Sequence, residues 1–274
     1  MQKITSGDMI DLQGQKHMVW QAILKEAREA SRDQPLMASF FHSNVINHQS
    51  FADSIAFYLS SRLASDAIPA MTIRTVFEQA IQNKPDIVDC MLDDLLAHYT
   101  RDAACDQYII PLLYFKGFHA LQCYRIAHWL WSQQRDMLAI YLQHRISELF
   151  AVDIHPAAQI GSGIMLDHAT GLVIGETAVI GNDVSILHGV TLGGSGASGG
   201  NRHPKIGSGV LLSAGAKLLG NITVGDGAKI GAGSLVLTDV PARVTVAGVP
   251  AKQVGRARVD KPSLAMDHSI DQDE

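Results

Sequence analysis

The spacing of hydrophobic residues differs between two parts of the chain. Up to residue 150, apolar residues recur at the three- and four-residue spacing of amphipathic helices. Two stretches show this most clearly: Val19, Ile23, Ala27 and Ala30, then Ile73, Val76, Phe77, Ala80 and Ile81. Prolines at positions 35, 69, 85 and 111 separate the segments, because proline disrupts a helix interior. We therefore predict several helices over residues 1–150, with the stretch from Pro111 to Phe150 as the longest.

After Phe150 the period is six. Aliphatic residues recur at this spacing in three runs, which are Ile154, Ile160 and Leu166; Ile174, Ile180, Ile186 and Leu192; and Ile206, Leu212, Leu218, Val224, Ile230 and Val236. Such hexapeptide repeats predict short strands joined by tight turns, with one aliphatic side chain per face stacked on the next coil. The predicted fold class is α+β, with an α-helical domain over residues 1–150 and a left-handed parallel β-helix over 151–256.

Composition changes at the same boundary. Every aromatic residue lies at or before Phe150, whereas 21 of the 24 glycines lie after it. The core of a β-helix, formed by stacked aliphatic residues, is too narrow for aromatic side chains. The loss of aromatic residues after Phe150 therefore supports the β-helix. The polar tail, residues 257–274, is acidic at its end, and we expect it to be flexible.

Charge and cysteine content exclude several functions. The net charge is −5 and no cluster of Lys and Arg stands out, so we expect no nucleic-acid partner. The opening residues have no apolar core, and no uncharged apolar run approaches membrane-spanning length. The three cysteines, Cys90, Cys105 and Cys123, lack the spacing of a metal site and suit a reducing compartment. We expect a soluble cytoplasmic protein.

The repeat breaks twice, and each break contains a histidine. Leu166 and Ile174 are eight residues apart, and Leu192 and Ile206 are fourteen apart. Insertions in a repeat scaffold lie on its surface, where binding sites form. His168 lies in the first break and His203 in the second, so the two could converge within one subunit or between neighbouring subunits.

A histidine at such a site suits acyl transfer to an alcohol. A hydroxyl is a weak nucleophile at neutral pH, and histidine is the side chain best able to take its proton as it attacks. The glycine-rich second break lets the backbone approach a ligand closely. Histidines inside regular coils, such as His155 and His188, are more simply surface or packing residues.

Three other functions fit part of this pattern. A zinc carbonic anhydrase uses three histidines on the same fold, with His155, His168, His188 and His203 as candidates, but none of these forms a close pair in sequence. An acyltransferase for sugars or xenobiotics would normally lack the long helical domain. A non-catalytic scaffold would not need irregular breaks with a histidine in each.

The motifs at these breaks resemble the bacterial serine acetyltransferase family. The stretches that carry the resemblance are V-D-I-H-P-A-A from Val152, L-D-H-A-T-G-L-V-I-G-E-T-A-V-I from Leu166, G-G-N-R-H-P-K-I from Gly199 and A-G-V-P-A-K from Ala247, with T-R-D from Thr100 and P-L-L-Y-F-K-G-F-H-A-L-Q-C-Y-R from Pro111 upstream. The resemblance covers most of the chain. It implies transfer of acetyl from acetyl-CoA to the hydroxyl of L-serine, the first step of cysteine biosynthesis from serine, without a metal.

The resemblance also implies roles for individual residues. His168 would be the general base, with Asp153 fixing its tautomer, and His203 the second essential histidine. The serine ammonium would be held by Asp102 and Asp167 and its carboxylate by Arg202, while His203 would contact the substrate and help to stabilise the intermediate. The co-substrate contacts are implied for Gly194 and Ala214, as backbone donors to the pantetheine arm, and for Lys229, near a phosphate.

The implied assembly is a homo-oligomer, a hexamer built as a dimer of trimers, with acetyl-CoA bound between neighbours. Feedback inhibition by L-cysteine in the serine pocket is also implied. Many members end in an isoleucine whose carboxylate enters the active site of O-acetylserine sulfhydrylase. This chain ends in Glu274, with Ile270 four residues inside, which speaks against that complex.

Overall fold

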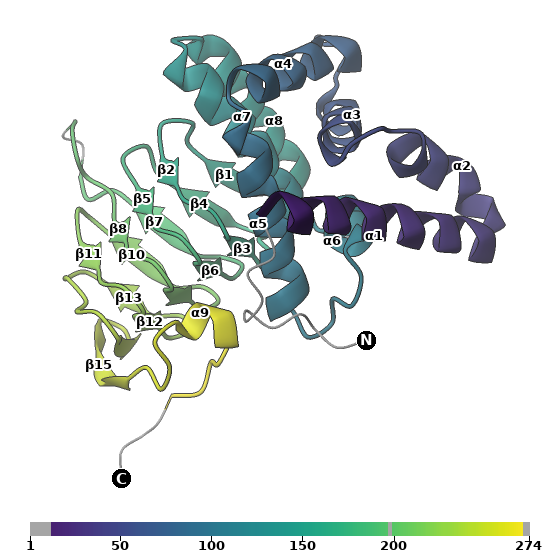
Figure 1. Cartoon of the computed structure of the whole chain (residues 1–274). Coiled ribbons are helices and arrows are strands. Elements are labelled where there is room, and N and C mark those ends of the chain that lie inside the picture. Colours follow the sequence, from purple (N-terminus) through teal and green to yellow (C-terminus); the bar gives the residue numbers. More distant parts are fainter. Residues whose placement is uncertain (1–11, 197–198, 271–274) are drawn as a thin grey trace. The chain divides into compact units, whose positions relative to one another are not determined.

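The computed structural model of the chain describes residues 12–196 and 199–270. The chain forms two compact units, residues 1–114 and 115–274, drawn together in Figure 1. The division lies before the boundary that composition indicates at Phe150, because α7 and α8 pack against β1 and β3 of the second unit. Among the described residues, we find no helix with the length and hydropathy that a membrane crossing requires. Expectations about the first eleven residues and Glu274 lie outside the described part.

The first unit is helical, as its period predicts. Its elements are α1 (Leu12–Asp33), the 3-10 turn η1 (Pro35–Met37), α2 (Ala38–Phe41), the π-helical turn η2 (His42–Ile46), α3 (Phe51–Leu63), α4 (Ala70–Asn83), α5 (Asp86–Arg101) and α6 (Ile109–Tyr114). The predicted apolar stripes of α1 and α4 form part of the core, where Ile23 and Phe77 are completely buried. Pro69 and Pro85 stand immediately before α4 and α5, which is where a proline is tolerated.

The predicted long helix over Pro111–Phe150 is wrong. The stretch contains the end of α6, then α7 (Lys116–Ser132) and α8 (Asp136–Phe150), which pack against each other. Between them the exposed Gln134 takes a left-handed conformation with φ of 58°, which reverses the chain. The longest helix is instead α1, with 22 residues.

The second unit contains short parallel strands. They are β1 (Val152–Ile154), β2 (Gln159–Ile160), β3 (Met165–Leu166), β4 (Leu172–Ile174), β5 (Val179–Ile180), β6 (Ser185–Ile186), β7 (Thr191–Gly193), β8 (Lys205–Ile206), β9 (Leu211–Leu212), β10 (Lys217–Leu219), β11 (Thr223–Val224), β12 (Lys229–Ile230), β13 (Leu235–Val236), β14 (Val244–Gly248) and β15 (Ala251–Arg256). Every third strand up to β13 joins the same sheet, which gives the orders β1-β4-β7-β10-β13, β11-β8-β5-β2 and β15-β14-β12-β9-β6-β3. This is the predicted parallel β-helix.

The register confirms the predicted ladders. In the first sheet Ile154 pairs with Ile174, which stands level with Leu192, Leu218 and Val236. The other two sheets align their ladders in the same way, through Ile180 with Ile206 and Ile186 with Leu212 among others. These side chains are almost fully buried, so the six-residue period records the core of the β-helix.

Glycine follows the ladder residue where successive coils stack most closely. A Cβ at Gly207 would lie 2.7 Å from the backbone nitrogen of Asp226, and one at Gly225 would lie 2.5 Å from that of Ala242. Backbone atoms cannot move aside as a flexible side chain can, so these positions exclude any larger residue.

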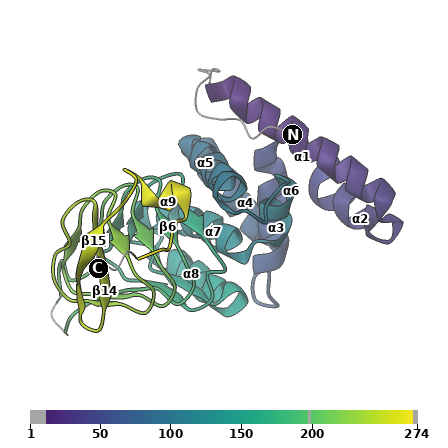
Figure 2. The same ribbon diagram turned by 90° about the horizontal axis from the view of Figure 1, so that it is seen from below.

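The segment after Arg256 has defined contacts, although its composition led us to expect a flexible tail. Its short helix α9 (Pro262–Ala265) lies beside β6 in Figure 2. Ser263 is fully buried, its carbonyl accepts a hydrogen bond from the Ser185 hydroxyl at 2.9 Å, and Lys261 pairs with Asp183 at 2.7 Å. The segment therefore covers part of the third sheet as far as residue 270.

Candidate active site

His168 stands on a strained turn between β3 and β4. His168 and Ala169 both have left-handed backbones, with φ of 54° and 59°. Such a conformation costs about 1–2 kcal/mol for a residue with a Cβ and is found where the surroundings impose it. The start of α7 supplies that support, because Gly117 packs so closely that a Cβ would lie 2.1 Å from the Leu166 carbonyl, and Lys116 donates a hydrogen bond to Thr170.

The His168 side chain is largely exposed and has polar neighbours. Its Nε2 lies 3.8 Å from the Asp167 carboxylate, and its ring is 6.0 Å from that of His188 on the next coil, edge to face. The predicted partner Asp153 instead accepts a hydrogen bond from Gln143 of α8 at 2.6 Å. Among the described residues no hydrogen bond joins Asp153 to His168, so their pairing stays a prediction.

His203 is buried at the opposite end of β4. Its ring lies directly over Gly175, where a Cβ would approach Nε2 to 2.1 Å. Its Nδ1 accepts a hydrogen bond from the backbone N–H of Thr177 at 3.2 Å and lies 2.9 Å from the Thr177 hydroxyl. That hydroxyl oxygen also accepts hydrogen bonds from the backbone N–H groups of Arg202, at 3.0 Å, and His203, at 3.1 Å.

The charges around His203 favour its neutral form. Burial lowers the pKa of His203, and the nearby Arg202 guanidinium lowers it further. Arg202 is itself held by Glu176, with 2.8 Å between Nη2 and a carboxylate oxygen. Burial also lowers the pKa of Lys205, whose ammonium donates a hydrogen bond to the His203 carbonyl at 3.1 Å.

The predicted site residues of the second unit other than Asp153 and Lys229 lie in two clusters. The His168 corner contains Asp167, His168, His188 and Ala214, where hydrogen bonds between successive coils join Gly189 to Thr170 and Gly215 to His188. The His203 corner contains Gly175, Glu176, Thr177, Gly194, Arg202 and His203, and a Cβ at Gly194 would lie 3.3 Å from His203 Nε2. The two corners lie at opposite ends of β4, because His168 precedes this strand and His203 packs on Gly175, which follows it; the four residue steps from Gly171 to Gly175 span about 13 Å. One chain therefore does not bring the two histidines together.

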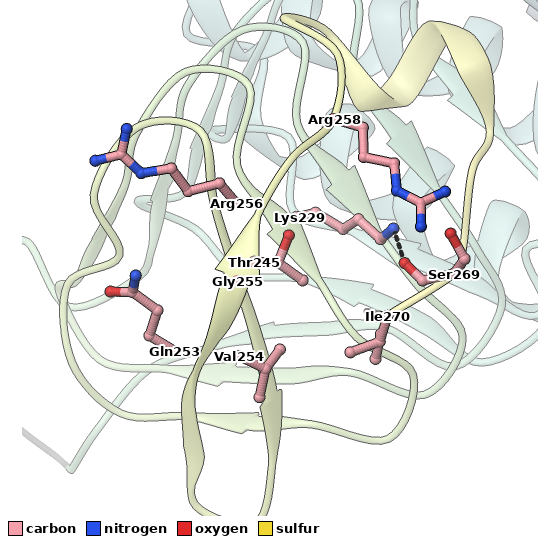
Figure 3. Close-up of a pocket in the computed structure, with 9 residues that line it drawn as sticks. All are labelled: Lys229, Thr245, Gln253, Val254, Gly255, Arg256, Arg258, Ser269 and Ile270. Atoms are coloured by element: carbon pink, nitrogen blue, oxygen red, sulfur yellow. Dashed lines mark hydrogen bonds between the residues drawn. The ribbon is translucent and has the colours of Figure 1, made fainter. Parts of the chain in front are cut away.

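A cavity of about 360 Å³ lies near the third sheet (Figure 3). Three cationic residues line it, namely Lys229, Arg256 and Arg258. Lys229 is buried, donates a hydrogen bond to the Ser269 carbonyl and lies 3.9 Å from the Asp267 carboxylate. An anionic group would find favourable charge here.

Asp102 belongs to the first unit. It follows the last residue of α5 as its C-cap, and its carboxylate accepts a hydrogen bond from the backbone N–H of Ala104 at 2.8 Å. A turn of this kind is a common structural use of aspartate. Its predicted contact with the serine ammonium stays a prediction.

The described residues contain no group of three or more His, Cys, Asp or Glu side chains arranged to hold a metal ion. The four histidines weighed as zinc ligands are divided between the two corners. His155 packs on the Trp131 ring, with centroids 5.2 Å apart. Its Nδ1 accepts a hydrogen bond from the Ala157 N–H at 3.1 Å, which fits the packing role expected for it.

Sequence reasoning missed the residues that hold the predicted ones in place. Thr177 and Glu176 belong to the G-E-T-A stretch of the family motif, and they contact the inserted loop from 25 or 26 residues away. Gln143, the partner of Asp153, had no signal in the sequence. For Glu176 and Thr177, the only signal in the sequence was a pair of polar residues at a turn of the β-helix.

Comparison with known proteins adds independent evidence. The family profile described as "Serine acetyltransferase, N-terminal" matches residues 19–123, and the bacterial transferase hexapeptide profile matches residues 203–238. A serine acetyltransferase of Escherichia coli K12 is 56% identical over 250 residues, which cover 91% of this chain and 92% of the relative. A crystal structure of serine acetyltransferase from Vibrio cholerae is 55% identical with a TM-score of 0.92, over 93% of this chain and 98% of that one.

Solved relatives also include complexes. A serine acetyltransferase bound to cysteine is 52% identical, with a TM-score of 0.91 over 93% of this chain and 99% of that one. One from Brucella abortus bound to coenzyme A is 48% identical, with a TM-score of 0.86 over 92% and 99%.

Proposed function

The chain belongs to the serine acetyltransferase family and transfers acetyl from acetyl-CoA to the hydroxyl of L-serine, and from this premise we propose how its residues share the work. The observation that carries the proposal is the exposed His168 on its braced, left-handed turn. His168 is the general base. It takes the hydroxyl proton as the serine oxygen attacks the thioester carbon, and it returns a proton to the departing CoA sulfur.

Serine is held by opposite charges at its two ends. Arg202 binds the carboxylate, because its guanidinium is already oriented by Glu176 and makes paired hydrogen bonds. Asp167, beside His168, binds the ammonium together with Asp102. A zwitterion held in this way presents its hydroxyl to the base, whereas a sugar lacks both charges.

Acetyl-CoA is the co-substrate, and the cationic cavity of Figure 3 suits its phosphates. Lys229 and Arg258 bind these anionic groups. The backbone N–H groups of Gly194 and Ala214 contact the pantetheine arm. Binding of this kind weakens with salt, because it depends on charge.

The complete site needs two copies of the chain. The His168 corner and the His203 corner lie at opposite ends of β4, and in the proposed assembly the His168 corner of one copy faces the His203 corner of its neighbour. In a trimer, each His168 corner meets the His203 corner of a neighbouring copy. Two trimers joined through the helical units form a hexamer. Such a site has two complementary halves, as a heterologous interface requires. We assign the assembly to the cytoplasm, with cysteine as a competitor for the serine pocket, since a relative binds cysteine.

A mixed oligomer tests the shared site. His168→Ala and His203→Ala subunits are each inactive alone, whereas co-expressed subunits recover about one quarter of the wild-type sites, because random pairing reunites intact halves at that frequency. Mixtures that stay as inactive as the two parents would contradict a shared site.

A panel of acceptors tests the substrate. Release of CoA from acetyl-CoA is measured with L-serine, and with L-threonine, glycerol and a sugar as controls. The proposal expects release with serine far above the controls. Equal release with a neutral alcohol would contradict the roles of Arg202 and Asp167.

A further inference from the structure

The hydrogen bonds around His203 fix its chemical role. We infer that Thr177 is a positioning residue whose hydroxyl holds His203 in the neutral tautomer with the proton on Nε2, so that His203 donates a hydrogen bond to the substrate and is not a base. The inference rests on the proposed function, because it assigns the part played by one histidine of that site.

The donors around the Thr177 hydroxyl determine this tautomer. The Thr177 oxygen accepts hydrogen bonds from the backbone N–H groups of Arg202 and His203, at 3.0 and 3.1 Å. A hydroxyl accepts two hydrogen bonds and donates one. Its own hydrogen is therefore directed at the remaining neighbour, His203 Nδ1, at 2.9 Å.

The backbone N–H of Thr177 independently favours the same tautomer. The Thr177 N–H is only a donor, and it points at the same Nδ1 from 3.2 Å. An Nδ1 that faces two donors carries no proton, and a neutral imidazole then has its proton on Nε2. The imidazolium form would place an N–H against both donors, so the protein disfavours it.

The Nε2 edge of the ring is flanked by glycines. Cβ atoms built at Gly175 and Gly194 would lie 2.1 and 3.3 Å from Nε2. Because both positions are glycine, no Cβ from either of them blocks Nε2, although the Arg202 side chain lies beside Gly194. An N–H donor fixed in that direction suits a carboxylate oxygen of serine or the oxyanion of the tetrahedral intermediate.

The charged groups that face His203 act on its protonation in different directions. Arg202, Lys205 and, when protonated, His155 oppose a second proton on the ring, whereas Glu176 favours it. Burial opposes it as well and is the largest influence on the pKa of His203, which is lowered. The Thr177 hydroxyl donor also opposes a second proton on the ring. Its removal therefore raises the pKa of His203.

Three variants test the inference by CoA release with serine. Thr177→Val removes the hydroxyl at nearly constant volume and lowers kcat/KM for serine by roughly tenfold, as the loss of about one hydrogen bond implies. Thr177→Ser keeps the hydroxyl and restores most of the activity. The matched control Thr223→Val makes the same change at an exposed position of β11 and leaves kcat/KM unchanged.

Two readouts separate a tautomer from a general structural role. The loss caused by Thr177→Val deepens as the pH is lowered, because His203 then takes its second proton. The same substitution in a His203→Gln background costs about threefold or less, since the residue it acts through is gone. Equal losses in both backgrounds, with no change in pH profile, would overturn the inference, as would full activity of Thr177→Val. A wild type that releases no CoA with serine would refute the proposed function instead.

Discussion

Gly175 supports the His203 ring, and adding one methyl group there displaces it. In Gly175→Ala the new Cβ would lie 2.0 Å from Cδ2 and 2.1 Å from Nε2 of His203, far inside contact distance. The ring must move by more than 1 Å to relieve this contact. It then leaves the Thr177 N–H and hydroxyl, and each lost hydrogen bond costs about 1 kcal/mol. Overpacking of this kind destabilises a fold by about 1–3 kcal/mol in total.

The effect on catalysis is larger than the effect on stability. A misplacement of about 1 Å in a catalytic group lowers a rate by roughly 10²-fold. We expect Gly175→Ala to fold, with a melting temperature lower by a few degrees, and to lose about two orders of magnitude in CoA release with serine.

A matched control exists in the inserted loop. Gly199→Ala makes the same change where an added Cβ meets none of the described residues within 4 Å, so its activity and melting temperature stay at wild-type values. A Gly175→Ala variant with wild-type activity would refute the reasoning, because it would mean that the His203 ring does not need this position.

Two further predictions concern binding and stability. Lys229→Ala raises the KM for acetyl-CoA by roughly tenfold and leaves kcat nearly unchanged, as the loss of a charge-assisted contact to a phosphate implies; an unchanged KM at low salt would contradict it. Burial lowers the pKa of both His155 and His203 below 6.5, so the unfolded chain binds protons first as the pH falls. The melting temperature therefore decreases as the pH is lowered from 7 to 5.5, and His203→Gln weakens this dependence; a melting temperature that rises on acidification would contradict it.

The ladder of the β-helix could be predicted from the sequence because its period is set by local geometry. Each coil places one aliphatic residue on each face, so Ile174, Leu192 and Leu218 reveal their register by spacing alone. The breaks in the period located both histidine turns for the same reason. The family resemblance supplied the reaction, which spacing could not.

The arrangement within the site could not be predicted in the same way. Thr177 binds His203 across 26 residues, and Gln143 binds Asp153 from a helix, so neither contact has a periodic signature. The order after Arg256 was missed because a polar segment can be held by a few hydrogen bonds, such as those of Ser263, without an apolar pattern.

The central claim is that His168 activates the serine hydroxyl, and the most direct test is CoA release from acetyl-CoA with L-serine by wild type, His168→Ala and, as a matched control, His144→Ala. His144 is an exposed histidine of α8, so its loss leaves the rate unchanged. The account predicts that kcat falls by roughly 10²–10⁴-fold in His168→Ala alone. A His168→Ala enzyme that releases CoA with serine at the wild-type rate would contradict it.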